Sequence, residues 1–342
     1  MLILVKIKGK LTDKIINSFK DTGFSLISRL TNLDIIIGEI EEQNLARMNS
    51  LDFIHTYELD EVYEIQAVNI TMMPNLKPGS LLKHEFFGAN VKVAVIDTGV
   101  NAYNLKLEGN HVFTDALDAS DAGTNGRLHG TYVAHIIKKI APWCKLYSLK
   151  VANSQGEILK SAILQAIDWC VGNDISVVNI SLGKRGDCKP TCLVCNSLSR
   201  IKERKGIAVV AMGNFGREGE GILSCPASSQ YALTVGAVNQ YRQLADYSSK
   251  GRPDSNKPDI LAPGWIQMTG DKEIEGTSFA APFISAVIAC LASNYCIDYI
   301  SNLLITTATD LKIPVHHQGS GLINIENMLG VIRDEKNTGT NS

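Results

Sequence analysis

The chain has 342 residues, enough for two domains or for one large domain with an appendage. Charged residues make up 20% of it and hydrophobic residues 45%, which excludes a disordered or collagen-like chain. Lysine and arginine (33 residues) nearly balance aspartate and glutamate (35 residues), so the net charge of −2 gives no electrostatic basis for binding nucleic acid or an anionic membrane.

The N-terminus and the apolar stretches bear on where the protein works. Only four apolar residues lie between Met1 and Lys6, and no small-residue cleavage site of a signal peptide follows them. No apolar run reaches the roughly 18 residues of a membrane span, and the stretch 280–292 contains Pro282 and Ser285. We therefore expect a cytoplasmic protein with no membrane partner, or one exported by a route other than the Sec pathway.

Residues 1–66 are predicted to form a small N-terminal domain. Alternation of apolar and polar residues predicts strands, and apolar residues at helical spacing predict helices between them. The order strand, helix, strand, helix, strand favours a small α+β domain of the ferredoxin-like type, with helices on one face of a sheet. With 11 acidic and 7 basic residues this domain complements the slightly basic rest of the chain. The predicted elements are a strand at 2–9, a helix at 12–24, a strand at 34–40, a helix at 41–51 and an extended stretch at 53–66.

From Val91 onward, apolar β-branched runs that end in polar or glycine residues alternate with helical stretches. That alternation predicts an α/β domain with a doubly wound, mainly parallel sheet, whose functional residues collect at the carboxyl ends of the strands. We assign residues 67–330 to this domain and 331–342 to a polar, frayed tail. The predicted strands are 91–97, 144–151, 175–183, 207–214 and 231–238, and the predicted helices include 129–140 and 157–173.

Three residues of this second domain are candidates for catalysis. Asp97 ends a predicted strand, His129 opens a predicted helix and Ser278 opens another. A serine hydroxyl is a weak nucleophile at neutral pH, so it needs a base within hydrogen-bond reach, and that base needs a third group to fix its tautomer. Taken singly, each residue fits a turn or a helix cap as well as it fits catalysis.

Together and in this chain order, the three residues resemble the triad of the subtilisin-like serine proteases, the subtilases. Residues 93–99, 129–131 and 276–282 match that family's aspartate strand, histidine helix and serine signature. Residues 179–183 match its substrate-groove strand, and 211–214 match the segment that bears its oxyanion asparagine. These five motifs imply a subtilisin-like fold over most of the chain.

The resemblance implies a serine endopeptidase that acts on proteins or peptides. Ser278 would attack the peptide carbonyl, His129 would take its proton and later give it to the leaving amine, and Asp97 would hold the imidazole. Asn214 would donate its side-chain amide to the oxyanion, alongside the backbone N–H of Ser278. No cofactor is required for this chemistry. A lipid or ester hydrolase is disfavoured because the serine stands in Gly-Thr-Ser and not in G-x-S-x-G.

The resemblance also implies a substrate groove in which an extended peptide lies as an added strand between two segments of the enzyme. A pocket beside the cleaved bond would take one side chain of that peptide. The two segments are Gly156, Glu157 and Ile158 on one side and Ser181, Leu182 and Gly183 on the other, and the pocket residues are Ala211, Met212, Gly213 and Ser224.

The N-terminal domain resembles the family's inhibitory propeptide, whose last segment lies in the active site as a product. Autocleavage is then expected near Gln66 and Ala67. The propeptide would serve the enzyme as a folding template and as an inhibitor. The alternative is an unrelated accessory domain.

One departure from the family's pattern concerns calcium. Secreted relatives often carry a calcium loop inserted in the histidine helix and an aspartate ligand soon after the catalytic one. Here the helix has no insertion, and Lys106 stands at the aligned ligand position. Because calcium requires anionic oxygen ligands, we expect that calcium site to be absent.

A second departure is a C-x₃-C-x₂-C insert directly after the groove strand. Its thiolates, together with Cys225, are candidates for a structural zinc site. A loop of reduced or locally oxidised thiols is an equal alternative, whereas an iron–sulfur cluster has no electron-transfer role here. The insert cysteines are Cys188, Cys192 and Cys195; the other four, Cys144, Cys170, Cys290 and Cys296, fall in apolar stretches and are predicted to be small core residues.

These observations predict a self-processing zymogen. It would be either a maturation protease that cuts one defined precursor or an intracellular degrader, and the insert beside the pocket favours the first. The alternative from another class is a catalytically silent pseudoprotease or a peptide-binding regulator. A binding module has no need for Asp97, His129, Ser278 and Asn214 together, so their presence argues against that alternative.

Overall fold

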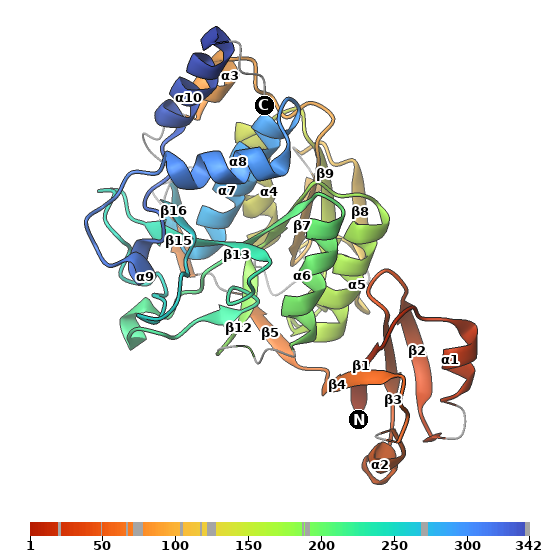
Figure 1. Ribbon diagram of the computed structural model, residues 1–342. Coiled ribbons are helices and arrows are strands. Elements are labelled where there is room, and N and C mark those ends of the chain that lie inside the picture. Colours follow the sequence, from red (N-terminus) through yellow and green to blue (C-terminus); the bar gives the residue numbers. More distant parts are fainter. Residues whose placement is uncertain are drawn as a thin grey trace.

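The computed structural model describes residues 1–338 except 20–21, 49, 66–67, 71–77, 103–104, 117, 122–127, 187, 189–191 and 268–272. At its centre lies a seven-stranded sheet in which all neighbouring strands are parallel, which confirms the predicted fold class (Figure 1). In order across the sheet, the strands are β16 (Ile260–Pro263), β15 (Ala232–Val238), β13 (Ile207–Ala211), β11 (Val177–Ile180), β7 (Lys92–Asp97), β9 (Lys145–Lys150) and β8 (Gly109–Val112).

Both faces of this sheet are buried, which explains the continuous apolar runs in the sequence. In β7, for example, Val93 and Val95 belong to one hydrophobic core, and Ala94 and Ile96 belong to the other. Alternate side chains of a strand face opposite sides of its sheet. The first face is covered by helices α4 (His129–Ile140) and α7 (Thr277–Ala292), and the second by α5 (Lys160–Gly172) and α6 (Leu193–Glu203) (Figure 1).

The sequence prediction missed β8 and β16, the two edge strands of this sheet. Both are short; β8 is partly exposed and polar, and β16 ends in Pro263, which cannot donate to a strand ladder. The predicted strand 175–183 divides into β11 and β12 (Leu182–Arg185), because the chain leaves the central sheet at Ser181.

The N-terminal domain is a four-stranded antiparallel sheet in the order β2-β3-β1-β4. Helices α1 and α2 lie in the connections, which gives the predicted ferredoxin-like arrangement with one strand more than expected. The extra strand is β2, an edge strand whose side chains are mostly exposed, so that apolar alternation is weak there. The elements are β1 (Leu2–Ile7), α1 (Asp13–Asn17), β2 (Ser25–Leu30), β3 (Ile35–Glu39), the 3-10 turn η2 (Glu42–Asn44), α2 (Leu45–Met48) and β4 (Ile54–Leu59).

This small sheet also has two buried faces. Ile3 and Val5 of β1 pack with Phe19 and Met48 on the side of α1 and α2. On the other side, Leu4 of β1 shares a core with residues of α5 and α6. Helices α5 and α6 are therefore sandwiched between the central sheet and the N-terminal sheet.

The predicted extended stretch 53–66 divides into β4, which stays in the N-terminal sheet, and β5 (Val62–Ile65), which joins the catalytic domain. The order of the sheet that receives it is β10-β5-β12-β14. Its other strands are β10 (Ile158–Leu159), β12 and β14 (Ser224–Cys225).

The remaining elements surround the central domain. Helix α10 continues to Thr338 and buries Ile332, so the tail predicted from residue 331 is helical and not frayed in its described part. These elements are β6 (Val68–Ile70), α3 (Gly79–Lys83), η4 (Gly216–Glu218), β17 (Trp265–Gln267), β18 (Glu273–Glu275), α8 (Ile297–Thr306), α9 (Val315–Gln318) and α10 (Ile325–Thr338).

None of the helices in the described part of the chain has the length and apolarity that a bilayer crossing needs.

Candidate active site

Asp97 and His129 meet at the carboxyl end of the central sheet. Asp97 is the last residue of β7 and His129 is the first of α4. Nδ1 of His129 lies 2.7 Å from Oδ1 of Asp97, and both side chains are buried. The backbone N–H of Thr98 donates to the same carboxylate oxygen over 2.7 Å. The imidazole is therefore held by Nδ1, which directs Nε2 away from the carboxylate.

Gly130 explains why α4 can begin so close to β7. A Cβ atom at this position would lie 2.1 Å from the carbonyl oxygen of Gly99 and 3.2 Å from the Cβ of Asp97. A side chain there would push the helix off the strand end and move His129 away from Asp97. The glycine after the histidine is thus required by packing.

Asp121 completes the start of α4 and was not identified from the sequence. This buried carboxylate accepts hydrogen bonds from the backbone N–H of Thr131 (2.9 Å) and from its hydroxyl (2.7 Å). Burial raises the pKa of Asp121, and the charge of Asp97 adds to the rise. In the sequence, Asp121 is marked only as an acidic residue eight positions before His129. Such a carboxylate can accept hydrogen bonds from the unpaired N–H groups of a helix start.

Ser278 lies in the first turn of α7 and is fully buried. Its hydroxyl donates to the carbonyl oxygen of Ser181 over 3.0 Å, and the Ser181 hydroxyl donates to the Ser278 carbonyl over 2.8 Å. Pro282 explains the second bond: it has no N–H, so the Ser278 carbonyl four residues earlier is released from the helix ladder. The ring of Phe279 lies 5.6 Å, centroid to centroid, from the ring of His129.

A buried chain of polar side chains connects this serine pair to the sheet. The amide of Asn179 donates to the Ser181 hydroxyl over 2.9 Å, and its oxygen accepts from Ser285 over 2.9 Å. Buried polar groups that are fully paired fix geometry, because each unmade bond is costly. These hydrogen bonds thereby hold the start of α7 against β11.

Among the described residues, Nε2 of His129 has no hydrogen-bond partner.

Asn214 lies beside the same helix start. Its Oδ1 accepts from the backbone N–H of Thr277 (2.9 Å) and from the Thr277 hydroxyl (3.0 Å). The Thr277 hydroxyl also accepts from the backbone N–H of Gly213 over 3.1 Å. Since Oδ1 is bound to the residue before Ser278, the donor side of the Asn214 amide is oriented by the first turn of α7.

Strand β5 occupies the predicted groove. It pairs antiparallel with β10, where Ile158 is opposite Tyr63, and with β12, where Leu182 is opposite Ile65. Of the predicted groove residues, Ile158, Leu182 and Gly183 pair with β5, and Leu159, which was not predicted, pairs as well. Ser181 binds Ser278, and Gly156 and Glu157 form the turn that leads into β10, with their backbone N–H groups bound to Asn153.

The predicted pocket residues lie at the end of β13 and in β14. The hydroxyl of Ser224 in β14 donates to the carbonyl oxygen of Met212 over 3.1 Å, and both residues are fully buried. Ala211 ends β13, and Gly213 contacts the start of α7 through Thr277. The structure therefore joins Ser224 to the segment 211–213, and the role of these residues as a substrate pocket stays a prediction.

Two carboxylates of the N-terminal domain hold it to the catalytic domain. Glu58 accepts from the backbone N–H of Leu193, the first residue of α6, over 2.9 Å. Asp60 accepts from the backbone N–H of Ser161 in the first turn of α5 over 2.8 Å. Burial raises the pKa of both carboxyls. Lys160, itself buried, binds Glu58 over 3.0 Å.

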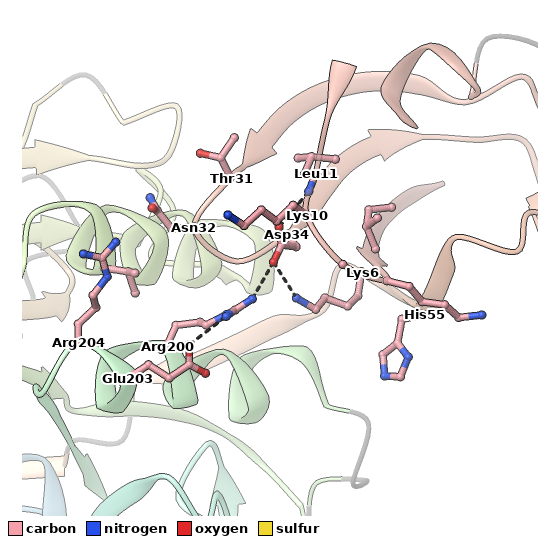
Figure 2. Close-up of a pocket in the computed structure, with 14 residues that line it drawn as sticks. Lys6, Lys10, Leu11, Thr31, Asn32, Asp34, His55, Arg200, Glu203 and Arg204 are labelled. Atoms are coloured by element: carbon pink, nitrogen blue, oxygen red, sulfur yellow. Dashed lines mark hydrogen bonds and ion pairs between the residues drawn. The ribbon is translucent and has the colours of Figure 1, made fainter. Parts of the chain in front are cut away.

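A second contact between the domains surrounds a cavity of about 800 Å³. Figure 2 shows Asp34 of the N-terminal domain between Arg200 of α6 and Lys6 of β1. The Asp34 carboxylate lies 2.7 Å from the Arg200 guanidinium and 3.9 Å from the Lys6 ammonium. None of the predicted catalytic or groove residues lines this cavity.

The four cysteines predicted to lie together do so. Their Sγ atoms are all within 4.8 Å of one another, and those of Cys192 and Cys195 lie 3.5 and 3.7 Å from that of Cys225. Hydrogen bonds, first with Cys188 and then with the other two thiols, lower the pKa of the Cys192 thiol.

The other predictions about ligands and cysteines have mixed outcomes. Cys144, Cys170 and Cys290 are buried as predicted, but Cys296 is exposed. The prediction for Cys296 was wrong because this residue lies in the turn before α8 and not in the apolar helix that precedes it. Lys106 is exposed, and the missing calcium site stays a prediction.

Comparison with known proteins identifies the family of the chain. Residues 88–321 match the model of the subtilase family. Subtilisin DY of Bacillus licheniformis is 31% identical over 274 residues, which cover 74% of this chain and 96% of that protein. Subtilisin E of Bacillus subtilis (strain 168) is 30% identical over 315 residues, which cover 86% of this chain and 75% of that protein.

A solved structure extends the likeness of the fold to nearly the whole chain. The crystal structure of the epidermin leader peptide processing serine protease from Staphylococcus aureus matches with a TM-score of 0.75 and 19% identity. The match covers 97% of this chain and 98% of that one. The match to the family model over residues 88–321 and the relatives that are 30–31% identical show that the chain belongs to the subtilase family. It is a serine endopeptidase, a hydrolase whose substrates are proteins or peptides.

Proposed function

We propose that this endopeptidase works through a triad of Asp97, His129 and Ser278. The Ser278 hydroxyl turns from the Ser181 carbonyl toward Nε2 of His129, which takes its proton as the oxygen attacks a peptide carbonyl. The charged imidazole that results is stabilised by Asp97 through the 2.7 Å contact at Nδ1. His129 then gives the proton to the leaving amine as the peptide C–N bond breaks. In the second half, His129 takes a proton from a water molecule that attacks the acyl carbonyl, and returns it to the Ser278 oxygen as the acyl group is released.

Asn214 stabilises the oxyanion of the tetrahedral intermediate. Its Oδ1 is bound to Thr277, so its amide N–H is oriented beside Ser278 without a conformational change during the reaction. The backbone N–H groups of the first turn of α7 and the positive end of its dipole add to this stabilisation. The Ser181 hydroxyl fixes the backbone of Ser278 at the same time.

The chain is made as a zymogen that cleaves itself after its N-terminal domain. The observation that carries this proposal is β5, which lies between β10 and β12 immediately before Gln66 and Ala67. An extended segment of the chain already occupies the groove as a substrate or product strand would. Gln66 and Ala67, where we place the cut, lie outside the described residues. While bound, the domain inhibits the enzyme, and it supplies acceptors to the starts of α5 and α6 during folding.

We place the enzyme among maturation proteases that cut a defined peptide precursor, acting inside the cell. The structural neighbour from Staphylococcus aureus processes the leader peptide of epidermin, and its chain matches this one over nearly the whole length, including the N-terminal domain. A leader peptide that binds as β5 does would add one strand between β10 and β12. General intracellular degradation is the competing role within the same class.

Self-processing is tested by comparing the wild type with Ser278→Ala, using Ser293→Ala at the other end of α7 as the control. The wild type and the control are expected to mature to a fragment of about 276 residues, and Ser278→Ala is expected to stay full length. Mass spectrometry of the purified proteins gives the cut position. Cleavage of isolated Ser278→Ala at the wild-type rate would show that another protease is responsible. A wild type that cuts neither itself nor a peptide library would support the pseudoprotease alternative.

A further inference from the structure

The four-cysteine cluster lies outside the catalytic machinery and has the arrangement of a metal site. Cys188 and Cys192 come from the connection between β12 and α6, Cys195 from the first turn of α6, and Cys225 from β14. Three of the four side chains are at least nine-tenths buried, with exposed fractions of 8% (Cys192), 6% (Cys195) and 6% (Cys225). Sulfur atoms from the stretch 188–195 and from β14 thus converge, and three of the four lie in the interior of the protein.

The spacing of the sulfur atoms matches ligands around one ion. A tetrahedral zinc ion with Zn–S bonds of about 2.3 Å keeps neighbouring sulfurs about 3.8 Å apart. The Sγ atom of Cys225 lies 3.5 Å from that of Cys192 and 3.7 Å from that of Cys195. The whole set fits within 4.8 Å, and none of the four cysteines forms a disulfide bond in the described part of the chain. Iron–sulfur clusters place several iron and sulfide atoms between the cysteines and need wider separations.

The surroundings suit thiolates and leave no open coordination position. Cys192 is at the N-cap position of α6 and Cys195 lies in its first turn, where the positive end of the helix dipole favours negative charge. Soft thiolate ligands select zinc over calcium or magnesium. With four protein ligands and apolar neighbours such as Leu193 and Val194, the ion has no position for a reactive water molecule.

We propose that Cys188, Cys192, Cys195 and Cys225 bind one Zn²⁺ as four thiolates and form a structural site. The ion ties β14 to the start of α6. Strand β14 pairs with β12 through Lys184 and Cys225, and the other edge of β12 pairs with β5 in the groove. The first N–H of α6, at Leu193, holds Glu58 of the N-terminal domain. Zinc therefore fixes one wall of the groove and one docking point of the N-terminal domain, and takes no part in bond cleavage.

The site is tested in full-length Ser278→Ala protein, in which self-cleavage cannot change the sample. Protein purified under reducing conditions without chelators is expected to contain about one zinc per chain by elemental analysis. Cys192→Ser and Cys188→Ser, each added to Ser278→Ala, are expected to reduce zinc to background. Cys296→Ser, at an exposed cysteine outside the cluster, is the matched control and is expected to keep the full zinc content. Cys188 is the least buried of the four, so its variant serves if Cys192→Ser does not fold.

Two further measurements identify the ligands and the role. Exchange of the metal for Co²⁺ is expected to give the strong visible bands of tetrahedral thiolate cobalt, and these bands are lost in Cys192→Ser. The zinc-free variants are expected to melt several degrees below the Cys296→Ser control. Metal-free wild type, zinc retained in both cluster variants, iron in place of zinc, or a disulfide among the four cysteines found by mass spectrometry would each overturn the proposal.

Discussion

Two helices carry proposed catalytic residues, and two others contact the N-terminal domain. The two pairs of helices have different hydrogen-bond acceptors for the N–H groups of their first turns. The first turn of any helix leaves N–H groups without partners inside the helix. In α4, Thr131 donates to Asp121, and in α7, Thr277 donates to Asn214. Both acceptors belong to the catalytic domain, so the proposed self-processing would leave them in place.

In α5 and α6 the acceptors come from the N-terminal domain instead. Ser161 donates to Asp60 and Leu193 donates to Glu58. The backbone N–H of Lys160 also donates to the carbonyl of Glu61. The proposed catalytic side chains therefore stand on helices that are capped from within their own domain. The helices under the N-terminal domain have caps that the proposed cleavage would make removable.

The largest expected effect follows from removing the α7 cap, Asn214, which is also the proposed oxyanion donor. Asn214→Ala should lower kcat about 10²–10³-fold, the loss found for such a donor in a subtilisin, and it also removes the acceptor of Thr277. Steady-state kinetics on a peptide substrate measure the effect, with Asn294→Ala at the exposed end of α7 as the control. Activity within a factor of two of the wild type would exclude Asn214 from the oxyanion site.

Loss of Asp121, which caps α4, is expected to lower the stability of the fold more directly than it lowers the catalytic rate. Asp121→Ala should lower the free energy of unfolding by about 1–2 kcal/mol, the usual cost of a lost helix cap, and should weaken activity through the displacement of His129. Because burial raises the pKa of Asp121, its charged form is disfavoured in place, so Asp121→Asn, which keeps an acceptor oxygen, should cost less than alanine.

Denaturant unfolding in the Ser278→Ala background measures this ranking. Asp118→Ala removes an exposed carboxylate nearby and is the control. If alanine and asparagine at position 121 destabilise equally, the cap is not the reason that Asp121 is buried.

The sequence predicted those parts of the site that local pattern and family motifs determine. Helix α4 begins and ends at the predicted residues because His129 and Gly130 start it and its apolar spacing continues to Ile140. The four clustered cysteines were identified because three of them share a short insert and the fourth was placed by alignment. In both cases the informative residues are close in sequence or fixed by a motif.

Other parts depend on contacts that no local pattern contains. Asp121 resembles any surface acid until the fold buries it beside Thr131. The exchange of hydrogen bonds between Ser181 and Ser278 joins residues 97 positions apart. The helix caps of Glu58 and Asp60 likewise require the docking of one domain on another. Long-range geometry, and not propensity, decides these features.

A smaller effect is expected from removing Glu58 or Asp60, the caps that the N-terminal domain supplies to α6 and α5. Glu58→Ala and Asp60→Ala should each weaken the docking of the N-terminal domain by about 1 kcal/mol, the typical value of one helix cap. In full-length Ser278→Ala protein, hydrogen exchange at the amides of Leu193 and Ser161 should become faster. Glu39→Ala, at the exposed end of β3, should leave both amides unchanged. Unaltered exchange in all three variants would mean that the docking rests on apolar contacts alone.

The smallest expected effect is the pH dependence of the same docking. Burial raises the pKa of Glu58 above its ordinary value of 4.5 and that of Asp60 above 3.8. The docked carboxyls therefore hold protons more tightly than the released ones. The contribution of these two groups to docking is largest in acid and falls as the pH rises through the raised pKa values. Above that window the contribution of these groups is constant. In self-processed protein, the release rate of the N-terminal domain should rise a few-fold between acidic and neutral pH, and Glu58→Gln with Asp60→Asn should flatten the profile. A steeper profile in the double variant would place the pH-sensitive groups elsewhere in the interface.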